Sequence, residues 1–214
     1  MKLLSTQNQR KREPQLSRDD WIVAALGVLM NDGIEAVQIT RLARDLGVTR
    51  GSYYWHFKGR KDLLSALLEE WSARNTGVMV DVLKSATSLD DGVLDLFSVW
   101  VDHSRFSFRL DQAIRDWGRR DQVVGEILSK EDDDRGEAIA AFYERHGYAH
   151  PESFIRARVI YFTQLSYYAL NITEPMEKRV SYLAAYFQCF TGRDIDQRVA
   201  DEFTRRFLAE EHSQ

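Results

Sequence analysis

The 214-residue sequence has little cysteine and proline and no long apolar run. Its single cysteine, Cys189, excludes an internal disulfide, and because it lies in the apolar stretch 184–190 we expect a buried thiol. The three prolines, at positions 14, 151 and 175, leave long intervals in which helices can run. No stretch approaches the roughly 18 uncharged apolar residues of a membrane-spanning helix, and no signal peptide is evident, which predicts a cytoplasmic protein without a membrane partner.

The alternation of apolar and polar residues that is typical of strands is nearly absent, whereas apolar residues recur every three or four positions after Ser17. The sequence therefore predicts an all-α protein. Ser17 is suited to cap a first helix, with its hydroxyl accepting from the amide of Asp20, and that helix ends near 31–33. Further helices are expected at about 60–84, 91–107, 111–117, 121–146, 151–171, 175–191 and 195–210. Gly147 and Gly192 fit helix ends.

The charge is distributed unevenly along the chain. The formal net charge is -4, yet residues 1–75 carry 12 basic against 9 acidic residues, whereas residues 76–214 carry 17 against 24. Within 38–61 six basic residues face a single acidic one, Asp45. The basic residues of this segment are Arg41, Arg44, Arg50, Lys58, Arg60 and Lys61. Such a local excess of positive charge is typical of a nucleic-acid contact, although a solvated charged face is an alternative.

Two short helices separated by a glycine are predicted between residues 38 and 57. Apolar residues at 39, 42, 43 and 46 follow the spacing of a short buried helical face. Gly47 can adopt the left-handed conformation that ends this helix, and Thr49 can cap the next one. Tyr53 and Phe57 of the second helix turn inward. Two short helices across a glycine turn form the helix-turn-helix pattern of DNA-binding proteins.

A protruding helix with an arginine near its start can enter the major groove of double-stranded DNA, where Arg50 would donate two hydrogen bonds to guanine. Thr40 is placed to reach a base or a phosphate. Thr49, Tyr54, His56, Lys58 and Arg60 are of the types that bind phosphate oxygens.

The ordered motifs Leu42-Ala43, Leu46-Gly47-Val48-Thr49-Arg50-Gly51, Tyr54-Trp55-His56-Phe57-Lys58 and Leu63-Leu64 resemble the N-terminal domain of the tetracycline-repressor (TetR) family over residues 17–72. The polar, basic composition of residues 1–16 predicts a flexible arm. The resemblance implies a three-helix DNA-binding domain at 17–62 and a larger helical domain for ligand binding and dimerisation at 63–214. It implies a repressor that a small molecule releases from a palindromic operator. It also implies that Thr40, Arg50, Ser52 and Tyr53 face bases and that Tyr54, His56 and Arg60 bind phosphates. The predicted DNA-binding set further includes Thr49, Gly51 and Lys58.

The sequence departs from the family pattern in three places. Gln38 stands where a Ser or Thr cap is usual, and Gly59-Arg60 replaces the usual Ser-Lys. Tyr53 replaces an aliphatic residue or Phe, which leaves open whether it packs inward or points its hydroxyl at DNA.

The C-terminal helices carry apolar stripes that suit a homodimer interface of four helices, two from each subunit. The stripes comprise Ile155, Val159 and Phe162, followed by Val180, Leu183, Ala184 and Phe187. From the sequence alone, burial of these faces within one subunit is an equal alternative. The resemblance favours the dimer.

A dense set of aromatic residues could line a pocket for a small, largely apolar ligand. The candidates are Trp100, His103, Phe106, Trp117, Phe142, Tyr161 and Tyr168. Ordinary core packing is the alternative for each of them.

The sequence offers little support for an enzyme, since the common nucleotide-binding, hydrolase and zinc-protease motifs are missing. No cofactor or metal site is expected. His146 and His150 have ligand-like spacing but fall in a predicted loop, and the acidic run 131–134 is expected to be the solvated side of a helix. A DNA-binding adaptor without a ligand is the remaining alternative.

Overall fold

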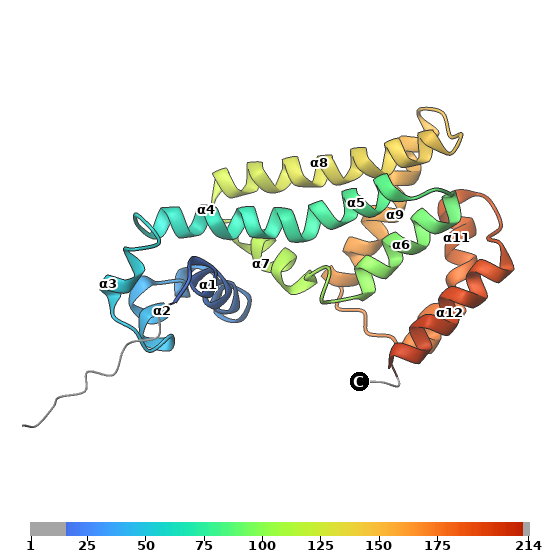
Figure 1. The fold of residues 1–214 in the computed structure, drawn as a ribbon. Helices are drawn as coiled ribbons and strands as arrows, with labels where there is room; N and C mark the ends of the chain where they lie inside the picture. The colour runs from blue at the N-terminus through green and yellow to red at the C-terminus, as the bar shows by residue number, and fades with distance from the viewer. Residues whose placement is uncertain (1–15, 212–214) are drawn as a thin grey trace, which may run out of the picture. The chain divides into compact units, whose positions relative to one another are not determined.

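The computed structural model describes residues 16–211, and every regular element in that range is helical (Figure 1). The predicted all-α class is therefore confirmed for the described residues. The chain divides into two compact units with the boundary between Leu67 and Leu68, and each unit is described by itself. The basic arm expected at 1–16 lies outside the described residues, apart from Leu16.

The first unit holds α1 (Arg18–Asp32), the 3-10 turn η1 (Ile34–Ala36), α2 (Ile39–Asp45), α3 (Arg50–Tyr53) and most of α4 (Arg60–Trp71). The second unit begins in the last turn of α4 and continues with the π-helical turn η2 (Ser72–Gly77), α5 (Val78–Ser85), α6 (Leu89–Val101), α7 (Phe108–Gly118), α8 (Gln122–Arg145), α9 (Glu152–Ala169), α10 (Met176–Ser181), α11 (Leu183–Thr191) and α12 (Gln197–Glu211).

The start of α1 follows from its capping residues. The amide of Asp20 donates to the Ser17 hydroxyl (3.2 Å), and the amide of Ser17 donates to the Asp20 carboxylate (2.7 Å). These bonds with Ser17 lower the pKa of Asp20. Two of the amides that a helix start leaves without partners are thus satisfied, which confirms the predicted cap.

The helix expected at 60–84 contains an irregular turn. Residues Ser72–Gly77 form a π-helical turn between α4 and α5. The Asn75 side chain is buried there, donates to the Ser107 carbonyl (3.1 Å) and accepts from the Ser107 amide (3.2 Å). The wider turn therefore brings a polar side chain into the interior of the second unit. Such π-helical turns are frequent at functional sites.

Two other helices differ from their predicted bounds. The Asp102 carboxylate accepts from the amide and the hydroxyl of Ser104 (2.9 and 2.6 Å), so α6 ends at Val101 and not at 107. Side chains of this kind compete with the helix for backbone groups. The helix expected at 175–191 is two helices, α10 and α11, which meet at Tyr182.

The core of the second unit forms where α8 packs against α7 and α9, and where α5 packs against α6 and α8. Buried aromatic side chains from several helices meet there, including Trp100, Phe142, Tyr143 and Phe187. Fully burying one large apolar side chain contributes about 1.5–3 kcal/mol. This cluster therefore holds the helices of the unit together.

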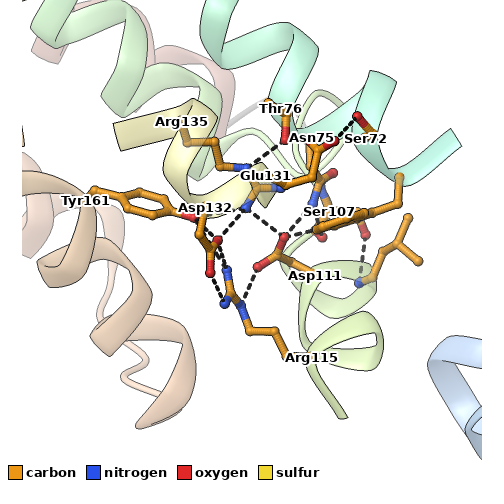
Figure 2. Close-up of polar contacts among 12 residues, drawn as sticks. Ser72, Asn75, Thr76, Ser107, Asp111, Arg115, Glu131, Asp132, Arg135 and Tyr161 are labelled. Atoms are coloured by element: carbon orange, nitrogen blue, oxygen red, sulfur yellow. Dashed lines mark hydrogen bonds and ion pairs between the residues drawn. The ribbon is translucent and has the colours of Figure 1, made fainter. Parts of the chain in front are cut away.

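A buried ion network crosses this core (Figure 2). The Arg135 side chain is 0% exposed and that of Asp111 is 2% exposed. Arg135 donates through Nη1 to Asp111 Oδ1 (3.0 Å) and Tyr161 Oη (3.0 Å), and through Nε to Thr76 Oγ1 (2.8 Å). Trp71 Nε1 also donates to Asp111 Oδ1 (2.9 Å). The network thus links η2, α7, α8 and α9.

Arg115 supplies the second cation of the network. Its Nε donates to Asp111 Oδ2 (2.8 Å), and its two terminal nitrogens donate to both oxygens of Asp132 (2.8 and 2.7 Å). Burial alone would raise the pKa of Asp111, but Arg135 and Arg115 outweigh it and hold that pKa below its usual value. Two arginines and two aspartates therefore balance each other, as buried charges require.

Two expectations from the sequence are wrong in this unit. The run 131–134 is not simply solvated, since Glu131 accepts from the Ser72 hydroxyl (2.8 Å) and Asp132 joins the ion network. Cys189 is exposed, because the inward positions of α11 fall at Phe187 and Phe190. An apolar neighbourhood along the chain did not indicate which side of the helix the thiol occupies.

Candidate DNA-binding site

The turn between α2 and α3 has the geometry predicted from the sequence. Gly47 has φ +69°, the left-handed region that favours glycine, and the Val48 amide donates to the Ala43 carbonyl (2.9 Å). Leu42 and Ala43 are buried on the inner face of α2. The small Ala43 and the tight turn keep α2 and α3 in contact.

Tyr53 is buried. Its ring lies edge-on to Trp21 and stacks on Phe57, with centroids 5.2 Å away in both cases, and its hydroxyl donates to the Gly59 carbonyl (2.9 Å). Burial raises the pKa of Tyr53 to about 12. The position implied for Tyr53 at the bases is therefore corrected, because both the ring and the hydroxyl are engaged inside the unit.

Arg60 holds the backbone that leads into α2. Its Nε donates to the Val37 carbonyl and its Nη2 to the Ile34 carbonyl, both at 2.8 Å. A guanidinium has five N–H donors, so others remain for a phosphate. Sequence reasoning missed this second role, since Arg60 is more than 20 positions from its partners.

The remaining predicted DNA-binding residues lie on α2, on α3 and in the segments directly before and after α3. Thr40, Thr49, Arg50, Gly51, Tyr54 and Lys58 are exposed, and Ser52 and His56 are half-buried. The Thr49 side chain makes no capping bond, although it stands at the predicted cap position. Gln38 likewise makes no capping bond to α2 and donates instead to the Glu35 carbonyl (3.1 Å).

Two exposed features of this unit were not predicted from the sequence. Trp55 is 83% exposed, the largest value among the exposed large hydrophobic residues of the described chain. Thr40, Gln38, Arg41 and Arg44 line a surface hollow of about 300 Å³. The sequence could have indicated Trp55, because it is an aromatic residue that does not belong to the inward-facing pair Tyr53 and Phe57.

The residues predicted for a ligand pocket are mostly core residues. Trp100 lines an apolar cavity of the second unit, and the other six are not among the residues that line it. Phe106, Trp117 and Phe142 are buried, His103 is exposed, and Tyr161 belongs to the ion network. Tyr168 stacks on Phe106 (5.8 Å) and donates to the Trp100 carbonyl (2.9 Å).

The residues predicted for a dimer interface fall into two groups. Ile155, Val159 and Phe162 on α9 are exposed, as is Ala184 on α11, and Val180 is half-buried. Leu183 and Phe187 are buried within their own unit, so they are not available for an interface. Their periodicity marked a buried face but did not distinguish a core from an interface.

The described residues hold no group of three or more His, Cys, Asp or Glu side chains placed to bind a metal ion. Within the same part of the chain no helix is long and apolar enough to cross a membrane.

The fold and this surface define a helical protein whose first unit is a helix-turn-helix domain. Residues 22–67 match the family described as "Bacterial regulatory proteins, tetR family". Over these residues the chain is therefore similar to that family.

Curated relatives likewise match over a short stretch of the chain. The transcriptional regulator AcrR of Shigella flexneri is 37% identical over 59 residues, or 28% of this chain and 27% of AcrR. The class D tetracycline repressor of Escherichia coli is 39% identical over 61 residues, or 28% of each chain. The match thus spans about a quarter of the length of these relatives.

Solved structures extend the likeness of fold to most of the chain. A transcriptional regulator of Rhodococcus sp. Rha1 superposes with a TM-score of 0.59 over 91% of this chain and 97% of that one, at 16% identity. At this identity the likeness shows the fold alone, including a larger helical unit after the first domain.

Proposed function

We propose that this protein is a sequence-specific DNA-binding transcriptional regulator, and that it acts as a repressor. The observation that carries the proposal is the helix-turn-helix itself, in which the exposed Arg50 is the first residue of α3. A helix that starts with an exposed arginine is suited to guanine in the major groove of double-stranded DNA. A repressor needs only to occupy a promoter, which requires no further contact with polymerase.

In this proposal Arg50, Thr40 and Ser52 face the bases, and Gly51 permits close approach of the backbone. Thr49, Tyr54, His56, Lys58 and Arg60 contact phosphates and fix the register on DNA. Trp55 joins the phosphate-contacting residues because it is exposed beside Tyr54. Tyr53 supports α3 from inside through its bond to Gly59.

A homodimer would read a palindromic operator with two such units about 34–36 Å apart, one turn of DNA. Exposed apolar residues on α9 support this assembly. Phe154, Ile155, Val159 and Phe162 are exposed there, and the Arg158 guanidinium lies over both phenylalanine rings (5.3 and 4.8 Å). An apolar face of this kind is typical of interfaces between subunits.

A small apolar ligand would release the repressor by favouring a conformation that binds DNA poorly, with a coupling of about 1–3 kcal/mol. A DNA-binding adaptor without a ligand is the alternative. Screening metabolites for weaker DNA binding separates the two, because an adaptor would respond to none.

Footprinting of the purified protein on the DNA upstream of its own gene tests DNA recognition. We expect a protected, approximately palindromic site, with affinity that falls steeply as salt rises. Arg198→Ala, at an exposed arginine of α12, serves as a control that leaves the footprint unchanged. Binding of equal strength to all sequences would contradict a sequence-specific regulator.

A further inference from the structure

A cavity of about 70 Å³ lies within the second unit, lined by residues of α6, α9, α10, α11 and α12. Most of its wall is apolar, with Trp100, Ile160, Leu183, Phe190 and Phe203 among the lining residues. A single water needs about 10–15 Å³ of such space, so the cavity has room for roughly five non-hydrogen atoms. These dimensions suit the apolar body of a small molecule.

Gln164 on α9 lines the same cavity and is 8% exposed. Its amide nitrogen Nε2 is buried, and no acceptor meets it with regular hydrogen-bond geometry. Burial raises the pKa of Tyr168 and the Gln164 side chain lowers it, so a weak bond to the Tyr168 hydroxyl occupies at most one of the two N–H donors of Nε2. Buried polar groups are almost always satisfied, so this nitrogen indicates an acceptor that the folded chain does not itself supply.

The cavity also has a single charge in its wall. Arg179 on α10 is the only charged residue among those that line it in the described chain. The guanidinium lies over the Tyr167 ring (5.3 Å), while the neighbouring Glu174 forms its ion pair with Lys178 (2.9 Å). A cavity with a cation, a free amide donor and no acidic residue in its wall favours an anion with several acceptor atoms.

We propose that this cavity binds a small apolar monocarboxylate. The apolar body fills the space between the aromatic residues, and the carboxylate accepts from Gln164 Nε2 and pairs with Arg179. Of the pocket residues predicted from the sequence, only Trp100 belongs to this site. The inference rests on the proposed ligand response and names the chemical class of its ligand.

Titration of the full chain with propionate and propionamide, which have five non-hydrogen atoms each, tests the site in the absence of DNA. The two probes have nearly the same shape, and only propionate carries a charge. We expect propionate to bind about tenfold more tightly, because a hydrogen bond to a charged group is the stronger one. Arg179→Met should remove this preference, and Gln164→Met should weaken the binding of both probes about two- to tenfold. Val180→Phe, which fills the cavity, should abolish the binding of both.

Two exposed residues provide matched controls. Arg198→Met and Gln188→Met remove the same side-chain types outside the cavity, and both should leave the two affinities unchanged. A measurement on the unaltered protein avoids any loss of folding: the methyl protons of bound propionate should show nuclear Overhauser effects to the methyl groups of Ile160 and Leu183. Absence of saturable propionate binding, equal binding of the probes, or binding without these effects would overturn the proposal.

A separate measurement of operator affinity distinguishes this inference from the proposed ligand response. Propionate that binds in the cavity without changing operator affinity would support the site and contradict a response to this class of ligand. Compounds that release DNA equally well from wild type and Val180→Phe would overturn the site and leave the ligand response intact.

Discussion

The two units use arginine in opposite ways. In the first unit Arg50 and Arg44 extend from the surface of a small domain, whereas in the second unit Arg135 is fully enclosed and paired with Asp111. Exposed positive charge attracts phosphate and leaves folding almost unaffected, but an enclosed charge is tolerated only while its partners remain. We therefore expect loss of an arginine interaction to reduce DNA binding in one unit and stability in the other.

The largest effect is expected from breaking the enclosed pair. Asp111→Asn leaves Arg135 without its nearest counter-charge, and the loss of one partner of a buried pair costs about 3–5 kcal/mol of unfolding free energy. Urea unfolding followed by circular dichroism measures the change. The double variant Asp111→Asn/Arg135→Met should recover part of this loss. Full additivity of the two changes would show that the pair is not coupled.

Lowering the pH should weaken the same ion pair in the unaltered protein. Because the folded-state pKa of Asp111 is lowered, its contribution to stability is present at neutral pH and is lost as the pH falls below the usual aspartate pKa toward that folded value. We expect the unfolding free energy to decline over this acidic range. The decline should be shallower in Asp111→Asn, and identical slopes would exclude Asp111 as the titrating group.

In the first unit, Arg50→Ala should weaken operator binding by about 1–3 kcal/mol and relax the preference at one base position. Lys58→Ala, by contrast, should weaken all sequences alike and lower the salt slope by about one. Fluorescence anisotropy on operator and scrambled DNA at several salt concentrations measures both. A reversed pair of phenotypes would contradict the roles proposed for these two residues.

The Tyr53→Phe variant tests whether Tyr53 supports α3 from inside the unit or contacts DNA. Removing the hydroxyl loses its bond to Gly59, which should cost about 0.5–1.5 kcal/mol of stability while operator affinity stays within about twofold. Thermal unfolding and anisotropy are measured on the same sample. A large loss of operator affinity in a protein that remains folded would indicate that Tyr53 contacts the bases of DNA.

The smallest effect is expected where charge is exposed and paired. Lys130→Ala removes a surface pair with Asp134, four residues along α8, which is open to solvent and screened by salt. We expect the midpoint of urea unfolding to stay at the wild-type value. A shift as large as that of Asp111→Asn would remove the distinction between enclosed and exposed pairs.

The first unit could be predicted closely from the sequence because its signals are local. Ser17 with Asp20, Gly47 and the inward face of α2 depend on neighbours within about five positions, and chain geometry alone relates them. The turn, the Ser17 cap and the direction of Phe57 were therefore predicted correctly, whereas the cap expected from Thr49 does not form. The second role of Arg60 was not, because its partners lie on a distant part of the chain.

The second unit was predicted only in outline. Helical periodicity located most of its helices, but the burial of Arg135 and the pairing of Asp132 depend on contacts between helices far apart in sequence. A charged residue in a periodic helix usually faces water, so the acidic composition wrongly predicted that Asp132 is simply solvated. Periodicity likewise could not assign Phe187 to the core of its own unit rather than to an interface.

The exposed position of Cys189 has a practical consequence. Because it is the only cysteine of the chain, one thiol-reactive dye will label α11 at a single defined place without any mutation. In the proposed homodimer each assembly would carry two identical labels related by the twofold axis. Energy transfer between protomers labelled separately would then follow subunit exchange directly.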